Sequence, residues 1–311
     1  MLNYLKKRTN LKYGVFFIFF TLLILFIIAK NAMMLSFSEI FNPKLSKIEG
    51  KVNRFVDKGY KISITYLYFK GGRKDIEKNI EVFKEIVDYL DEKYKGINDI
   101  FQRGKVSLKI IQFGMTQEEK LENLAKFVNY AKSKNIFVWI SAFHYKNVHE
   151  ECSYYLYLRD RGYTNLGITI ACYHTTASAY VDLILQKGGH IRLVKGYYND
   201  GQIKDWTKVT QNYLHNSKKI IKSVNYHQLA THDFKNILDP LNKIKRLDTL
   251  YNIEFGFFVN ADKHVERESK KYRIKLSNKC IFITFGKKFR YIRSNFLHIS
   301  YPRLIRAKNI I

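Results

Sequence analysis

Two basic side chains inside an apolar stretch are the first candidates for chemistry. Residues 190–200, HIRLVKGYYND, have the character of a buried strand and its exit, yet they contain Arg192 and Lys195. A buried cation without a partner is costly, so either acidic side chains neutralise these two residues or a ligand brings negative charge. On a straight strand the two side chains would point to opposite faces, but Gly196 allows the chain to turn and a ligand to approach the backbone.

The elements that must position these residues alternate between strand-like and helix-like patterns. Apolar runs rich in β-branched and aromatic residues predict strands at 61–69, 106–113, 136–141, 167–173, 190–195, 226–231, 252–258 and 280–285. Helical spacing of apolar residues predicts helices at 74–93, 117–134, 149–161, 176–187, 201–222, 234–247, 261–272 and 287–297. This alternation indicates an α/β protein with the eight-fold β/α (TIM-type) barrel fold. A doubly wound open sheet is the alternative, but no G-x-G-x-x-G motif follows the first strand.

In such a barrel the active groups lie at the C-terminal ends of the strands. This rule selects Lys109 from the second predicted strand, Thr231 and His232 at the end of the sixth, and Glu254 in the seventh. These polar residues also have purely structural explanations: Lys109 could extend to solvent, Arg192 could pair with Glu254, and His232 could be a core histidine. Together the cations outnumber the nearby acids, which predicts a site for an anionic ligand such as a phosphate-bearing cofactor or a carboxylate substrate.

The N-terminal part of the chain predicts a membrane segment. Residues 13–29, YGVFFIFFTLLILFIIA, carry no charge and suit a single-pass transmembrane anchor. A cleaved signal peptide is the rival interpretation, but the apolar run is long for one and no A-x-A-like cleavage site follows it. The predicted organisation is a basic tail (1–12), the anchor, a connector (30–59), the barrel (60–300) and a C-terminal tail (301–311). The basic tail favours a cytoplasmic N-terminus, while the side of the membrane on which the barrel lies stays open.

Charge and cysteine content narrow the classes of partner. The 311 residues include 54 basic and 27 acidic side chains, a formal net charge of +27, which raises nucleic acid or an anionic membrane surface as a partner. The lysines are spread along the chain without a compact basic block, so an ordinary solvated surface is favoured over a nucleic-acid site. Cys152, Cys172 and Cys280 are far apart and form no C-x-x-C pair. The last two lie in apolar runs and are predicted to be small core residues.

Several segments resemble the proline dehydrogenase family, whose members are FAD-dependent barrels. RLVKGYY at 192–198 resembles the family's RLVKGAY strand, and LATHD at 229–233 resembles its ATHN segment on the next strand. The resemblance covers about residues 60–298, and further similar segments follow in family order at 106–114, 167–173, 254–259 and 281–295.

The resemblance implies roles for individual residues. Arg192 and Lys109 would be catalytic, with Arg192 beside the reactive edge of FAD and Lys109 against the substrate carboxylate. FAD would be bound by Arg192, Lys195, Gly196, Thr231, His232 and Tyr173, and the substrate by Lys109, Tyr198, Tyr291 and Arg293. Positive charge beside FAD would stabilise its anionic reduced form. The implied reaction is oxidation of proline or a related imino acid by hydride transfer to FAD, with electrons passing to a membrane quinone.

The sequence also departs from the family pattern at several site positions. Residues of other types stand at Ala171, Ser141, Phe143 and Phe282, and Ser294 and Asn295 replace a pair of arginines. Losing one guanidinium removes a charge-assisted hydrogen bond worth roughly 1.5–3 kcal/mol. These departures favour an alternative function, a catalytically degenerate barrel that acts as a membrane-tethered binding or scaffold protein.

Overall fold

The computed structural model describes residues 45–67, 72–142, 147–196, 201–234, 236–240, 242, 252–273, 276 and 278–286. All of them belong to one compact unit, Leu45–Ile311. Within these ranges no helix is long and apolar enough to cross a membrane. The predicted anchor at 13–29 lies outside the described residues, and so do Tyr198, Tyr291 and Arg293; their roles stay predictions.

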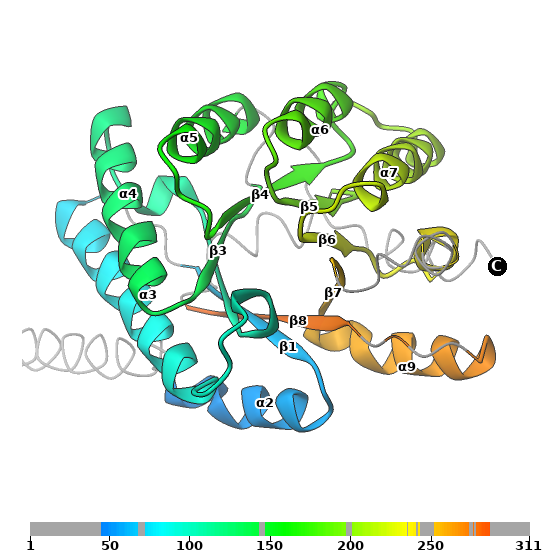
Figure 1. Ribbon diagram of the computed structural model, residues 1–311, viewed down its shortest axis with the longest axis horizontal. Coiled ribbons are helices and arrows are strands. Elements are labelled where there is room, and N and C mark those ends of the chain that lie inside the picture. Colours follow the sequence, from blue (N-terminus) through cyan, green and yellow to red (C-terminus); the bar gives the residue numbers. More distant parts are fainter. Residues whose placement is uncertain are drawn as a thin grey trace, which may run out of the picture. The chain divides into compact units, whose positions relative to one another are not determined.

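Eight parallel strands form a closed barrel in the order β1 to β8, which confirms the predicted fold (Figure 1). Each strand pairs with its sequence neighbour, and β1 closes the barrel against β8 from Lys61↔Cys280 to Tyr66↔Phe285. The strands are β1 (Lys61–Tyr66), β2 (Lys105–Leu108), β3 (Phe137–Ile140), β4 (Leu166–Ala171), β5 (Ile191–Val194), β6 (His227–Ala230), β7 (Ile253–Phe258) and β8 (Lys279–Phe285).

Helices surround this barrel, as Figure 1 shows. They are α2 (Ser46–Asp57), α3 (Arg73–Lys93), α4 (Gln117–Ser133), α5 (Val148–Asp160), α6 (Ala177–Gln186), α7 (Trp206–Ile221) and α9 (Asp262–Lys271). Short 3-10 helices lie at η1 (Ile100–Gln102), η2 (Ile110–Gln112) and η4 (Val259–Ala261), and residues 236–240 are helical as well. Helix α2 lies within the region predicted as a connector, yet its Val52 and Phe55 are fully buried in the main core. The predicted helix at 287–297 lies outside the described residues.

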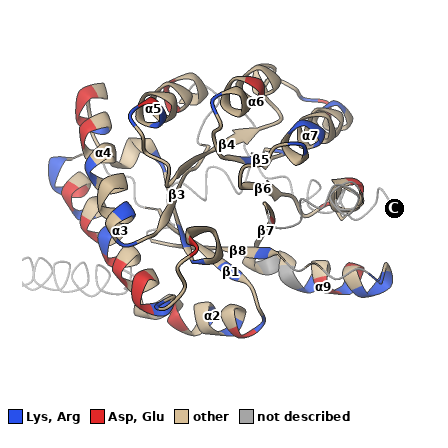
Figure 2. Ribbon diagram, viewed as in Figure 1, with Lys and Arg blue, Asp and Glu red and all other residues tan. Residues whose placement is uncertain are grey.

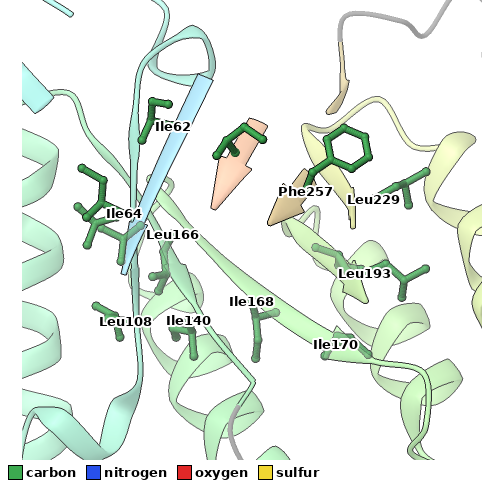
Figure 3. Packing of buried hydrophobic residues seen from close by; sticks show 14 of the residues in the cluster. Ile62, Ile64, Leu108, Ile140, Leu166, Ile168, Ile170, Leu193, Leu229 and Phe257 are labelled. Carbon is green, nitrogen blue, oxygen red and sulfur yellow. The ribbon is translucent and has the colours of Figure 1, made fainter. Parts of the chain in front are cut away.

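The main apolar core lies between the barrel and the helices. Side chains alternate along a strand, so Ile62 and Ile64 of β1 point outward while Ser63 between them points inward. Leu193 and Leu229 follow the same pattern on β5 and β6, and all four are completely buried (Figure 3). Strands covered on both faces read as nearly continuous apolar runs, which explains why they could be found in the sequence. Charged residues of both signs lie along the helices, whereas the strands are mainly uncharged (Figure 2).

The second strand is shorter than predicted, and the difference positions a candidate site residue. The predicted run 106–113 ends as a strand at Leu108, and η2 begins two residues later. The cause is Gln112, whose Oε1 accepts from the backbone N–H of Lys109 at 3.1 Å and whose Nε2 donates to the carbonyl of Tyr66 at 2.8 Å. These side-chain bonds take the place of ladder hydrogen bonds, so the chain turns directly after Lys109.

Candidate functional site

Arg192 crosses the interior of the barrel. It lies in the middle of β5, points inward, and is only 5% exposed. Its Nη1 donates to Ser107 Oγ on β2 at 2.7 Å and its Nη2 to Ser63 Oγ on β1 at 3.1 Å, while its Nε donates to Gln228 Oε1 on β6. The sequence positions 63, 107, 192 and 228 are thus brought together by the closure of the barrel.

The guanidinium also lies between two aromatic rings. The ring centroids of Trp139 and Phe282 are 4.8 Å and 4.7 Å from its Cζ atom, a separation typical of cation–π contacts. Burial lowers the pKa of Arg192 to about 10, which still leaves the group charged at neutral pH. Within the described residues no carboxylate forms an ion pair with Arg192, so its charge is held by neutral partners alone.

The acid that could have neutralised Arg192 is committed to two lysines. Glu254 of β7 is completely buried, and its Oε2 lies 3.2 Å from Lys105 Nζ and 3.4 Å from Lys61 Nζ. Its Oε1 accepts from Tyr226 Oη at 2.8 Å and from Gln228 Nε2. Burial by itself raises the pKa of Glu254, but the two lysines and the hydrogen bonds outweigh it and hold that pKa below its usual value. The direct Arg192–Glu254 pair considered from the sequence is therefore replaced by contact through Gln228.

These lysines lie toward the N-terminal end of the barrel, which is closed. Lys105 Nζ also donates to the carbonyls of Phe101 and Arg103, so its three protons all have acceptors. The ring of Phe101 stacks on that of Tyr226 with centroids 4.4 Å apart. Lys105, Phe137 and Glu254 have no exposed surface. Catalytic groups are not expected at this end of a barrel, so these contacts stabilise the fold.

The opposite, C-terminal end carries small uncharged side chains at several inward positions, beside the ring of Phe258, which is 44% exposed and packs on Phe282 and His232. The inward positions beyond Arg192 include Thr65, Ser141, Val194 and Thr284, and all four are partly exposed although they lie on or directly after barrel strands. Thr169, the register partner of Arg192 on β4, is buried, and its Oγ1 has no hydrogen-bond partner. The C-terminal end is therefore the less covered end of the barrel interior, and a buried hydroxyl without a partner and a buried guanidinium lie beneath it.

Lys109 follows β2 at this open end. Its side chain is 4% exposed, and its Nζ donates to the carbonyl of Ala142 at 2.8 Å. Ser141, which precedes that carbonyl, bonds Ser107 with an Oγ–Oγ distance of 2.6 Å, and Ser107 in turn accepts from Arg192. Both cations are thus connected to residues 141–142, directly after β3: Lys109 bonds the carbonyl of Ala142, and Arg192 reaches Ser141 through Ser107.

Lys195 and Gly196 are placed differently from what the sequence reasoning assumed. Lys195 Nζ forms an ion pair with Asp233 Oδ2 at 2.9 Å and donates to Thr210 Oγ1 at 2.8 Å. Protein groups therefore neutralise this cation without a ligand. Gly196 has a φ of +117°, so the expected turn is present, but the space in which a Cβ would lie is filled by the ring of Tyr173. Tyr173 thus packs on the backbone that was expected to approach a ligand.

Thr231 and His232 directly follow β6 at the open end. Thr231 is buried, and its Oγ1 accepts from the backbone N–H of Asp233 at 3.2 Å. His232 Nε2 accepts from the backbone N–H of Phe258 at 3.1 Å. Burial lowers the pKa of His232 to about 4, with a smaller contribution from His264. The ring is therefore neutral at pH 7, and because Nε2 is an acceptor its proton must lie on Nδ1, which is a hydrogen-bond donor.

Sequence reasoning did not identify Lys61, Lys105 or Gln228 as members of the interior cluster. A signal was present, because each is a polar residue at an inward position of an otherwise apolar strand. The inward face was not separable from the outward face until the register of neighbouring strands was known. All three cysteines are buried and free, which confirms the core assignment of Cys172 and Cys280.

Comparison with solved structures identifies the same barrel in proline utilization A proteins. The Bdellovibrio bacteriovorus protein, inactivated by N-propargylglycine, matches with a TM-score of 0.74 and 14% identity over 91% of this chain. A variant of the Bradyrhizobium japonicum protein matches at 0.63 with 18% identity over 76% of the chain, and the Corynebacterium freiburgense protein at 0.62 with 13% identity over 87%. The chain has a proline dehydrogenase-like fold.

This likeness extends over only part of those proteins. The chain covers 34%, 28% and 30% of the three matched chains, in the order given above. No protein-family model matches the sequence, and no curated protein matches it. The similarity to these proteins is thus a similarity of fold.

Proposed function

We propose that this barrel is a flavin-dependent oxidoreductase that oxidises proline or a related imino acid. The observation that carries the proposal is the charge of Arg192. The guanidinium is held by neutral oxygens and two ring faces, and the partly exposed side chains of Thr65, Ser141, Val194 and Thr284 lie beyond it at the C-terminal end. A fixed cation that has no direct carboxylate partner among the described residues, near the less covered end of the barrel, suits a ligand that gains negative charge during the reaction.

The residues at the open end fit the polar ring edge of a flavin. Arg192 supplies charged donors, Thr169 an unsatisfied buried hydroxyl, and His232 a neutral imidazole with its proton on Nδ1. The exposed ring of Phe258, which packs on Phe282 at the same end, offers an aromatic surface for a planar ring. FAD would supply the hydride acceptor: the hydride would leave the substrate's ring carbon beside the nitrogen, and the C=N bond would form as the nitrogen loses its proton.

The protein's own residues would orient the substrate and support this charge transfer. Lys109 is rigidly held beside the segment after β3 and would pair with the substrate carboxylate. Arg192 would favour electron transfer because its positive charge is already oriented and needs no rearrangement of solvent. We further propose that residues 13–29 anchor the chain in a membrane and that the electrons pass to a quinone there, with Tyr198, Tyr291 and Arg293 as further substrate contacts.

A catalytically degenerate barrel that serves as a membrane-tethered scaffold is the second candidate, and two observations favour it. Asp233 neutralises Lys195, and Tyr173 fills the space at Gly196. Two of the residues expected to bind FAD are thus already occupied by the protein. Retention of FAD by the purified chain separates the two functions, because a scaffold has no need of the cofactor.

Arg192→Met tests the oxidoreductase. The variant keeps an unbranched side chain of similar length but removes the charge, so proline-dependent flavin reduction should fall by at least a hundredfold, about 2.7 kcal/mol at the transition state. Arg103→Met is the matched control, because Arg103 is also buried but bonds Asp91 and the carbonyl of Lys134 outside the barrel interior. Circular dichroism confirms that both variants fold. Flavin reduction at the wild-type rate in folded Arg192→Met contradicts the proposed role.

A further inference from the structure

The amide of Gln228 connects Arg192 to Glu254 across three neighbouring strands. The register pairs Arg192 with Gln228 and Gln228 with Glu254, so the three inward side chains lie side by side. Arg192 Nε donates to Gln228 Oε1, and Gln228 Nε2 donates to Glu254 Oε1. Gln228 has no exposed surface. This row of three side chains is called the Gln228 bridge below.

Only one orientation of the Gln228 amide is compatible with its neighbours. A guanidinium can only donate hydrogen bonds, and an ionised carboxylate can only accept them. Turning the amide over would bring its NH2 group against Arg192 and its carbonyl oxygen against Glu254, which creates two repulsive contacts in place of two bonds. Glu254 in turn is fixed by Lys105 and Tyr226. The Glu254–Lys105 pair at the closed end therefore fixes the acceptor of Arg192 Nε through Gln228, while Ser107 and Ser63 accept from its two Nη atoms.

The bridge also keeps a carboxylate from pairing directly with Arg192. A glutamate at position 228 would form a direct ion pair with Arg192 and cancel its charge, as Asp233 does for Lys195. A neutral amide supplies the acceptor oxygen without the negative charge, and it holds Glu254 one side chain farther away. The carboxylate of Glu254 is meanwhile shared between Lys105 and Lys61.

We propose that Gln228 is a positioning residue that fixes the guanidinium of Arg192 while leaving its positive charge available to the ligand at the open end. The proposal rests on the oxidoreductase function for its purpose, but the geometric part is independent of any cofactor. Gln228 contacts neither the open end nor the expected ligand, and acts only through Arg192.

The geometric part is tested by nuclear magnetic resonance on the full chain labelled with 15N-arginine. Arg192→Lys identifies the Arg192 Nε–H signal, since that signal disappears. In Gln228→Met this proton loses its acceptor, and its exchange with water should accelerate by at least tenfold. Gln112→Met is the matched control, because Gln112 is also a buried glutamine with bonds on both sides of its amide but lies outside the bridge. It should leave the Arg192 signal unchanged.

The electrostatic part is tested by Gln228→Glu with added FAD. The carboxylate keeps an acceptor for Arg192 Nε, so the proton stays protected. Its second oxygen faces Glu254 Oε1, so the measurement is made at a pH that ionises both carboxylates. The preference of the protein for reduced over oxidised FAD should then fall about tenfold, or about 30 mV for a two-electron couple. The double variant Gln228→Glu with Glu254→Gln restores the net charge of the row, but its carboxylate lies beside Arg192 and not at position 254. Its preference for reduced FAD should stay low.

The outcomes separate this proposal from the proposed function. Failure of the wild type to bind FAD refutes the oxidoreductase, whereas the exchange measurement still decides whether Gln228 positions Arg192. Equal exchange rates in Gln228→Met and Gln112→Met overturn the positioning role, and so does recovery of the FAD preference in the double variant. If neither Gln228 variant folds while Gln112→Met does, Gln228 is a structural residue and the proposal is refuted.

Discussion

Glu254→Gln should destabilise the barrel far more than the same change at an exposed acid. Glu254 is completely buried and is the acidic partner of Lys105, which is also completely buried, and of Lys61. The variant removes one negative charge and leaves both ammonium groups without this acidic partner. Its amide NH2 faces either the two lysines, which share Oε2, or the donors Tyr226 and Gln228, which share Oε1. Breaking a buried ion pair from one side typically costs about 3–5 kcal/mol, which is a large part of the roughly 5–15 kcal/mol that stabilises a domain.

The control is Glu122→Gln on α4. Glu122 pairs with Lys126 one helical turn away, with side chains 65% and 70% exposed, so this change should cost under about 0.5 kcal/mol. Urea denaturation monitored by tryptophan fluorescence gives both values. The chain has two tryptophans, Trp139 and Trp206, and both lie in the described barrel unit. A loss below about 1 kcal/mol for Glu254→Gln would refute the reasoning, since it would mean that the lysines are stable without their acid.

Two further predictions concern the pH dependence of stability and the packing around Gly196. Burial lowers the pKa of His190 to about 4 and that of His227 to about 3, against an ordinary value of 6.5, so the unfolded chain binds protons that the folded chain does not. The free energy of unfolding should therefore be constant above pH 6.5 and fall as the pH drops from 6.5 toward 4, by up to about 1.4 kcal/mol per pH unit for each histidine. Denaturation of His227→Gln at several pH values should show a shallower dependence of this free energy on pH. An unchanged dependence would contradict an origin in His227. Gly196→Ala drives a Cβ into the ring of Tyr173 at a positive φ and should lower stability by about 1–3 kcal/mol. Gly50→Ala in α2, with nothing within 4 Å of the added Cβ, should raise stability by about 0.5–1 kcal/mol, and equal effects of the two changes would count against the packing described at Gly196.

The strands and most helices were predictable because each strand is covered on both faces. A buried parallel strand must be apolar almost throughout, so runs such as those around Leu193 and Leu229 stand out from the amphipathic helices between them. The ends were less predictable, because they depend on single side-chain bonds. Gln112 ends β2 at Leu108, and no propensity in the segment 106–113 indicates that bond.

The cluster around Arg192 was predictable in part. The position of Arg192 at mid-strand and its need for partners were visible in the sequence, and so was the shortage of acids. The partners themselves were not visible, because Ser63 and Ser107 are 129 and 85 residues away and meet Arg192 only when the barrel closes. The ion pair of Lys195 was not predicted for the same reason, since its partner Asp233 lies 38 residues later, on the next β/α unit.

The visible absorption spectrum of the purified full chain, supplied with FAD and recorded before and after anaerobic addition of proline, tests the proposed chemistry most directly. We expect a protein-bound flavin spectrum that bleaches with proline in the wild type and does not bleach in Arg192→Met. A folded chain that retains no FAD would contradict the oxidoreductase and favour a scaffold with a proline dehydrogenase-like fold.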